Sequence, residues 1–332
     1  MGWPVASSLI RVLRARHVVA RSPRKVVRVV PARLFSRRGL TAIAVSTLAG
    51  LALLAAGCGT TTDSTRAGGS TGSLPSTSAG ATMPGMPGMN EPMPSGDGLS
   101  ASASGFTLTP ATTTLPAGAA QTFTFRITTA AGQNVTHFVP EQTQLLHFYL
   151  VRSDLTGFAH LHPRMSPEGV WSVGLPALSP GSWRIYTQFI TPNQAGQPVA
   201  LVLSAPLTVA GQASTVALPS PSTTTSVDGY ALTLSGQPAA GSERELTLTI
   251  GRDGTPVTDL QPYLDTYAHL TAIRDGDLAF AHLHPQGSVH GDHGGPTLTF
   301  HAEFPKPGDW RLFIQFQTSG TLHTAATTVH VS

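Results

Sequence analysis

His147-Phe-Tyr-Leu-Val-Arg152 is followed, after five residues, by Phe158-Ala-His160-Leu-His162-Pro163. The same arrangement recurs as His269-Leu-Thr-Ala-Ile-Arg274 and Phe280-Ala-His282-Leu-His284-Pro285. Two short apolar runs around a polar turn are typical of a β-hairpin, and each of these hairpins carries three histidines. The repetition predicts two copies of one module, each centred on a three-histidine hairpin.

A second motif follows each hairpin, Pro180-Gly-Ser-Trp-Arg184 in the first copy and Pro307-Gly-Asp-Trp-Arg311 in the second. Trp183 and Trp310 fall on the apolar face of their strands, so we expect them in the cores. Short alternating strands with regularly spaced turns and no helical run predict an all-β fold. We therefore expect two tandem immunoglobulin-like β-sandwich domains.

Composition divides the chain further. Residues rich in Gly, Ser, Thr and Pro bury too little apolar surface to fold, and they separate the modules from the N-terminus and from each other. The expected segments are a signal peptide (1–57), a disordered tether (58–104), module 1 (105–210), a stiffened linker (211–227) and module 2 (228–332).

The N-terminal segment predicts export. Residues 1–38 hold ten of the 20 Lys and Arg without an acidic residue, and a nearly uncharged apolar run covers residues 40–56. A basic region, an apolar run and small residues before a cut site form a signal peptide. Cys58, the only cysteine, follows Leu54-Ala-Ala-Gly57. This stretch resembles the lipobox of bacterial lipoproteins, in which the cysteine is diacylated. We expect a lipid-anchored protein of the cell membrane that faces the extracytoplasmic side; a plain membrane anchor is the alternative.

Charge and cysteine content exclude several classes of protein. From Cys58 onward the chain has 10 basic and 17 acidic residues, a formal charge of −7, which disfavours nucleic-acid binding. A single cysteine allows no intrachain disulfide, so stability must come from the hydrophobic cores. No nucleophile elbow, phosphate-binding loop or paired-carboxylate site is recognisable, and we expect a protein that is not an enzyme.

Asp275-Gly276 predicts a two-residue type I′ turn in the second hairpin. A turn centred there pairs residue 274 with 277, 272 with 279, and His269 with His282. Residues two apart on a strand share a face, so His284 joins the other two rings. The second copy is thus the better-defined cluster of three imidazoles, and we expect it to bind metal if only one copy does.

The same register in the first hairpin pairs His147 with His160, and it places His162 on the same face. Its turn is longer, and a slip of one residue would move His147 to the other face of the sheet. Three neutral imidazoles suit Cu(II), Zn(II) or Ni(II), and copper is our first expectation. The alternative is that the rings only pack and form hydrogen bonds, because duplication copies structural residues as faithfully as functional ones.

Other side chains extend the predicted metal sites. A Gly-rich loop after the second hairpin carries His290 and His293, and the remaining candidate fourth ligands are His137, Met165 and Asp259. Four of the six methionines, Met83, Met86, Met89 and Met93, fall within eleven residues of the tether. Thioethers are soft ligands that suit Cu(I). The alternative is a low-complexity segment in which Met is filler.

The pattern Pro256-Val-Thr-Asp-Leu-Gln-Pro262, with the histidines and the Pro-Gly-Asp-Trp-Arg motif of module 2, resembles a recurrent family of exported proteins of high-GC bacteria. That family is mostly uncharacterised and is sometimes joined to heavy-metal-associated modules, so the resemblance implies a connection with metals but no particular activity. The module is also similar in outline to periplasmic copper-resistance proteins, which are β-sandwiches with His and Met sites.

These observations together predict a membrane-tethered protein that buffers copper or hands it to a copper transporter or another metal-handling protein. Two alternatives remain at this point. One is a structural or adhesive surface lipoprotein with packing histidines. The other is an enzyme similar to copper-zinc superoxide dismutase, although the disulfide cysteines and Gly-rich active loops of that family are missing here.

Overall fold

The computed structural model describes residue 94, residues 97–291 and residues 293–332, apart from the side chain of His282. The elements of this part are all strands, and the part belongs to one compact unit. Nowhere in these residues is there an apolar helix of the length that a membrane crossing requires. The predicted signal peptide, Cys58 and the methionine tract at residues 83–93 lie outside the described residues.

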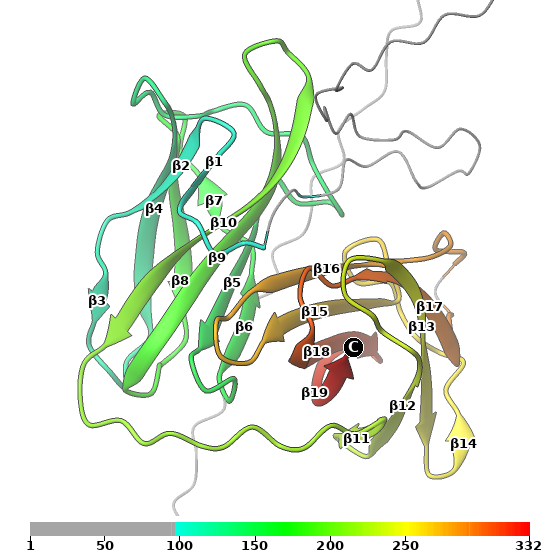
Figure 1. The fold of residues 1–332 in the computed structure, drawn as a ribbon. Coiled ribbons are helices and arrows are strands. Elements are labelled where there is room, and N and C mark those ends of the chain that lie inside the picture. The colour runs from blue at the N-terminus through cyan, green and yellow to red at the C-terminus, as the bar shows by residue number, and fades with distance from the viewer. Residues whose placement is uncertain (1–93, 95–96, 292) are drawn as a thin grey trace, which may run out of the picture. The chain divides into compact units, whose positions relative to one another are not determined.

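Module 1 is a sandwich of two five-stranded sheets, ordered β1-β2-β4-β8-β7 and β3-β10-β9-β5-β6 (Figure 1). The long antiparallel pair of β9 and β10 lies in the second sheet. The strands are β1 (Ser102–Ala103), β2 (Phe106–Pro110), β3 (Thr114–Leu115), β4 (Gln121–Thr129), β5 (His147–Arg152), β6 (Phe158–Leu161), β7 (Arg164–Met165), β8 (Val170–Leu175), β9 (Gly181–Pro192) and β10 (Pro198–Val209).

Module 2 repeats this plan in the strand order β11-β12-β13-β17-β16-β15-β18-β19, with β14 beside β13. β16 pairs with both β15 and β17, so it joins the two layers into one nine-stranded sheet. The strands are β11 (Thr224–Val227), β12 (Tyr230–Gly236), β13 (Glu243–Arg252), β14 (Thr255–Pro256), β15 (Ala268–Arg274), β16 (Phe280–Pro285), β17 (Thr297–Glu303), β18 (Gly308–Thr318) and β19 (Thr321–Val331). The predicted all-β fold of two tandem immunoglobulin-like sandwiches is confirmed.

The alternation of apolar and polar residues along the strands determines which side chains form the cores. In β4 the buried Phe123, Phe125 and Ile127 alternate with more exposed residues, as expected for a strand with one face inside. Trp183 and Trp310 are buried as predicted. Their indole groups donate to the carbonyls of Ser179 at 3.0 Å and Lys306 at 3.1 Å, four residues upstream in each copy, so the repeat extends to the hydrogen bonds.

β5 departs from simple alternation because all six of its residues are buried. Phe148 and Leu150 belong to the core of module 1. Tyr149 and Val151 point to the opposite face and join a third apolar cluster, whose members from module 2 are Ile273, Phe280 and Phe313. The sequence predicted two separate cores, whereas the structure adds a shared one between the modules.

Residues before the predicted boundary at residue 105 already contact the modules. The carbonyl of Asp97 accepts a hydrogen bond from the Phe280 amide, and that of Ser100 accepts one from the Ser204 amide. The Leu99 carbonyl accepts a bond from the Arg184 guanidinium at 3.2 Å. The last residues of the predicted tether therefore contact both modules. Composition could not show this, because the contacts use mainly backbone atoms.

The boundary of module 2 also shifts. β11 occupies residues that we assigned to the linker, and it pairs with β12 in an antiparallel ladder. The Ser222 amide donates to the carbonyl of Thr328. Module 2 therefore starts several residues before 228, because the Thr-rich end of the linker continues directly into an edge strand.

The predicted hairpin register was wrong by two residues. Thr271, not His269, lies opposite His282 in β16. The amide of Arg274 donates to the carbonyl of Ala279, so four residues form the loop instead of two, with Gly276 and Leu278 at positive φ. A two-residue I′ turn at Asp275-Gly276 is therefore absent.

The first hairpin has the same register, with Tyr149 rather than His147 opposite His160. A shift of two residues keeps each side chain on its predicted face, because faces alternate with a period of two. The one-residue slip that would have moved His147 away does not occur.

Candidate metal site

β5 and β6 bring three histidines of module 1 to the face that carries the shared cluster. His147 begins β5, His160 lies in β6 and His162 follows it. One ring nitrogen from each of the three lies within 4.8 Å of the other two. The ring centroids are 5.2 Å apart for His147 and His160, 5.2 Å for His147 and His162, and 4.8 Å for His160 and His162. The predicted convergence of these rings is present in the first copy.

Hydrogen bonds define which ring nitrogens carry protons. His147 Nε2 donates to the carbonyl of Glu141 at 3.1 Å, so its Nδ1 accepts a bond from His160 Nε2 at 3.0 Å. His160 Nδ1 then has a lone pair and lies 2.8 Å from the atom placed as Gln315 Oε1, so the amide oxygen and nitrogen exchange places in this tautomer. That amide must present its NH2 group to His160. Its oxygen can then accept a bond from Thr324, 3.3 Å away.

His162 differs from its two neighbours. Its Nε2 is a buried atom without a hydrogen-bond partner among the described residues, although the residue as a whole is half-buried. A buried polar atom left unsatisfied costs about 1–3 kcal/mol. This orphaned nitrogen, beside two rings that hydrogen-bond to each other, is the feature that a bound cation would relieve.

The rings of the cluster are held neutral. Burial lowers the pKa of His147 to about 3 and lowers that of His160 well below its usual range. Burial also lowers the pKa of His162. Neutral imidazole is the form that a metal ion requires of a histidine ligand, and the three rings have this form near neutral pH.

The residues around the cluster fix its rings. The Tyr149 ring stacks on His160 with centroids 4.4 Å apart, and its hydroxyl donates to Gln188 at 3.4 Å. Gln188 Nε2 lies 3.1 Å from both carboxylate oxygens of Glu141, which is 2% exposed. Burial raises the pKa of the Tyr149 hydroxyl, and the Glu141 charge adds to this effect. The site therefore has a buried carboxylate in its surroundings.

Module 2 contributes His269 to the same region. Its ring centroid lies 5.9 Å from that of His160, and its Nε2 donates to the Tyr263 carbonyl at 3.0 Å. Burial lowers the pKa of His269 to about 4. We expected His269 to form a separate site with His282 and His284. The side chain of His282 lies outside the described residues, while His284 is half-buried and has a pKa that burial lowers to about 4.

The other predicted ligands do not join the cluster. His137, Asp259, His290 and His293 are exposed. Met165 packs against the core of module 1. Among the described residues, the group close enough to hold one ion consists of His147, His160 and His162.

Sequence reasoning missed Glu141 and the part played by Gln315. Gln315 and Gln188 were visible as the repeated Gln of the Trp motif, on the face opposite Trp310 and Trp183, and this was an available signal. Both glutamines are buried, at 4% and 1% exposure. Glu141 gave no such signal, because module 2 has Tyr263 at the equivalent position.

Sequence reasoning also missed a second series of hydrogen-bonded polar side chains, which lies in module 2. His323 Nδ1 lies 2.8 Å from the Asp228 carboxylate, and its Nε2 lies 2.9 Å from the Thr318 hydroxyl. An acid, a histidine and a hydroxyl in this order resemble a hydrolase triad. Thr318 is only 2% exposed, and its hydroxyl also bonds to Tyr230 at 2.7 Å. This series therefore satisfies buried polar groups rather than presenting a nucleophile.

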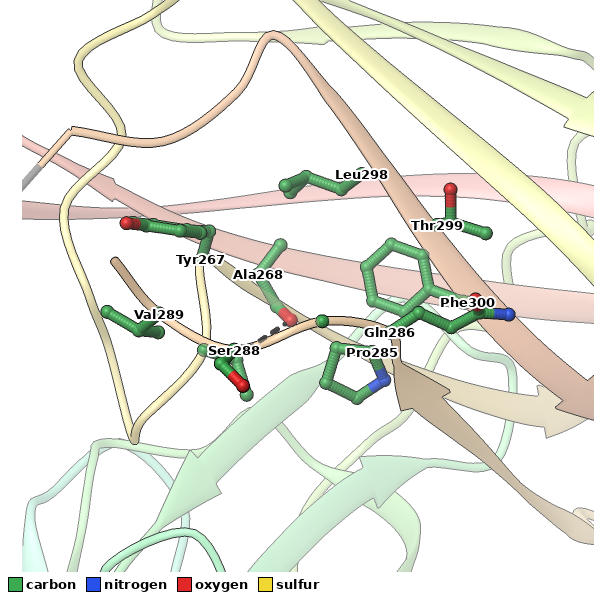
Figure 2. A pocket seen from close by; sticks show the side chains of 11 residues that line it. Tyr267, Ala268, Pro285, Gln286, Ser288, Val289, Leu298, Thr299 and Phe300 are labelled. Carbon is green, nitrogen blue, oxygen red and sulfur yellow. Dashed lines mark hydrogen bonds between the residues drawn. The ribbon is translucent and has the colours of Figure 1, made fainter. Parts of the chain in front are cut away.

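Figure 2 shows a small cavity beside the histidine-bearing strands of module 2. Its volume is about 30 Å³, which gives room for roughly one water molecule. The lining includes Tyr267, Ala268, Pro285, Ser288, Leu298 and Phe300. Apolar groups and hydroxyls dominate this lining, so it offers no set of metal ligands.

Comparisons with known proteins give a family. A family model described as "Domain of unknown function (DUF8832)" matches residues 101–205 and again residues 225–332. No curated protein matches the chain. The two matched segments correspond to the two modules.

Several solved structures match part of the chain. The adhesin FdeC of Escherichia coli is 19% identical, with 70% of this chain and 65% of that chain covered and a TM-score of 0.24. InvD of Yersinia pseudotuberculosis is 16% identical, with 70% and 58% covered and a TM-score of 0.23. The surface layer protein SbsC is 15% identical, with 68% and 31% covered and a TM-score of 0.21. The chain spans less than two thirds of the length of each, and similarity at this level carries no argument about function.

Proposed function

We propose that the protein is a membrane-anchored, extracytoplasmic metal-binding protein. The chain belongs to the DUF8832 family, whose description assigns no activity, so the proposal rests on the histidine site. The ion, copper in the first place, binds to His147, His160 and His162.

One observation carries this proposal, namely three neutral imidazoles with nitrogens within 4.8 Å of one another, one of them orphaned. With metal–nitrogen bonds of about 2.0–2.1 Å, neighbouring nitrogen ligands lie about 3.3 Å apart around tetrahedral Zn(II) and about 2.9 Å apart around tetragonal Cu(II). His147 Nδ1 and His160 Nε2 are already 3.0 Å apart. An ion could bind both atoms once the His160 proton has moved from Nε2 to Nδ1, which lies 2.8 Å from the Gln315 amide, and it would give His162 the partner that it lacks.

The choice of copper rests on ligand chemistry. Imidazole binds Cu(II), Zn(II) and Ni(II), and Cu(II) forms the strongest complexes of the divalent series. The methionine tract at residues 83–93 adds soft ligands for Cu(I). The protein would hold both oxidation states outside the cell and hand copper to a transporter or another metal-handling protein. Lipidation of Cys58 would keep it at the membrane.

The experiment is a Cu(II) titration of the purified chain from Gly59, beside His162→Ala. The Nε2 of His162 makes no hydrogen bond in the described part of the protein, so this variant should fold normally and leave the bond between His147 and His160 in place. His330→Ala is the matched control, because the side chain of His330 is 65% exposed.

We expect wild type and the control to bind Cu(II) at this site, and His162→Ala to bind it about tenfold or more weakly. Equal affinity in all three proteins would exclude the cluster as the site. A second arm changes Met83, Met86, Met89 and Met93 to Ser, which should reduce Cu(I) binding and leave Cu(II) binding intact.

A second candidate function has its own observation. The hydrogen bonds from Glu141 through His147 and His160 reach Gln315 of module 2 without a metal ion. This continuous chain favours a structural or adhesive surface protein in which the histidines hold the modules together. That function predicts no stoichiometric uptake of metal and an identical melting curve with and without a chelator. Superoxide turnover by the copper-loaded chain would favour a dismutase instead.

A further inference from the structure

The histidine cluster lies where the two modules meet. His160 contacts Gln315 of β18 at 2.8 Å, and its ring is 5.9 Å from that of His269 in β15. Aromatic contacts surround this region: Tyr149 and Phe280 have ring centroids 5.4 Å apart, and Phe158 and Phe313 stack at 4.1 Å. The cluster is therefore enclosed by residues of both modules.

His269 occupies in module 2 the position that His147 occupies in module 1. Each ring donates from Nε2 to the carbonyl of the residue six positions upstream, which is Glu141 for His147 and Tyr263 for His269. A neutral imidazole that donates from Nε2 keeps a lone pair on Nδ1. His269 thus offers the same ligand atom as His147 and lies beside His160.

We infer that His269 is the fourth ligand of the proposed site, so that one metal ion per chain joins module 1 to module 2. This inference rests on the proposed function, because it adds a ligand to the same cluster. The separation of 5.9 Å between the rings of His160 and His269 is close to the 4.8–5.2 Å within the triad. His269 is not part of the group whose nitrogens lie within 4.8 Å of one another, so its side chain would have to move toward the triad when the ion binds.

The surroundings fit a buried divalent ion. Four neutral imidazoles carry no charge, and an ion enclosed by them needs a compensating anion nearby. Glu141 supplies one, since its carboxylate is buried and bonds to Gln188, which pairs with His147 across β9 and β5. The ion would therefore be neutralised in part by a residue of module 1.

The inference also indicates what kind of site this is. Four protein ligands leave no open position on a tetrahedral Zn(II) or a square-planar Cu(II), as in structural rather than catalytic metal sites. His162 is the least buried of the ligands from module 1, so an ion would enter on its side. Binding would tighten the contact between modules, and release would loosen it.

The test compares His269→Ala with wild type, using Cu(II) and Zn(II) as separate probes on the chain from Gly59. His323→Ala is the matched control, because it removes another buried ring of module 2 that lies in a different polar chain. All proteins carry an inserted protease site in the exposed linker residues 211–217, so that the modules can be separated after folding.

We expect one ion per chain, with an affinity about tenfold or more lower in His269→Ala and unchanged in His323→Ala. After cleavage, the wild-type halves should stay together in the presence of metal at a urea concentration that separates them in a chelator. Metal should give no such protection to His269→Ala.

Two results would overturn the inference and leave the proposed function in place. One is two ions per chain, and the other is wild-type affinity in His269→Ala together with a loss in His162→Ala. Failure of the wild-type chain to bind either ion would instead overturn the proposed function.

Discussion

Acidification should destabilise the metal-free protein, because its buried histidines are neutral in the folded state. Burial lowers the pKa of His147 to about 3 and the pKa values of His269 and His284 to about 4, from an ordinary value of 6.5. As the pH falls below 6.5, the unfolded chain binds protons that the folded chain does not. The free energy of unfolding therefore decreases with falling pH, until the folded-state values near 3–4 are reached.

The size of this effect follows from the shifts. At about pH 5, an unfolded imidazole with a pKa of 6.5 gains about 2 kcal/mol from protonation, while a folded one with a pKa of 3 or 4 gains almost nothing. Three such rings acting independently lower the free energy of unfolding by about 6 kcal/mol between pH 7.5 and pH 5. A typical domain has about 5–15 kcal/mol in total, so the loss is large.

Urea unfolding followed by Trp fluorescence at a series of pH values, in a chelator, measures this loss. His147→Gln should reduce the pH dependence by about one proton, because its side chain does not titrate. A wild-type protein with the same stability at pH 7.5 and pH 5 would refute the reasoning, and so would a His147→Gln variant with an undiminished slope.

Three further substitutions test the packing by thermal and urea unfolding. Phe313→Ala removes a buried ring of the shared cluster and should cost about 3–5 kcal/mol; a value below about 1 kcal/mol would contradict the packing. Gly157→Ala would place its Cβ in steric overlap with the Trp183 ring and should cost about 1–3 kcal/mol, whereas wild-type stability would show that the ring can move. Thr318→Val leaves His323 without one partner and should cost about 1–3 kcal/mol; a neutral effect would mean that this bond is not formed.

Much of the fold could be predicted from the sequence, because the strand pattern is a local property and the same module occurs twice. The alternation of polar and apolar residues identified the strands, and the repeated spacing placed His147, His160 and His162 on one face. The register was missed because Asp275-Gly276 is a strong signal for a two-residue turn, whereas the loop closes two residues later, with Leu278 at positive φ. The residue types in this stretch do not distinguish a two-residue turn from the four-residue loop that is present.

The candidate site could be predicted only in part, because it depends on the contact between modules. Each hairpin was treated as a separate site, and no role was assigned from the sequence to Gln188 and Gln315, which follow the tryptophans by five residues and so lie on the opposite strand face. That face is buried in both copies because the modules cover each other. The periodicity of a strand shows which residues face away from the core of their own module, but it does not show whether another module covers that face.

The segment from Asp97 to Ser100 has a mechanical consequence. Its carbonyls and the Asp97 carboxylate bond to residues of both sandwiches, including Ser204 of module 1 and Lys306 of module 2. A pull transmitted along the chain from its N-terminal side would therefore reach both sandwiches at their junction, instead of passing through module 1 into the linker. The load would act across several hydrogen bonds in parallel, and the two sandwiches would resist it as a pair.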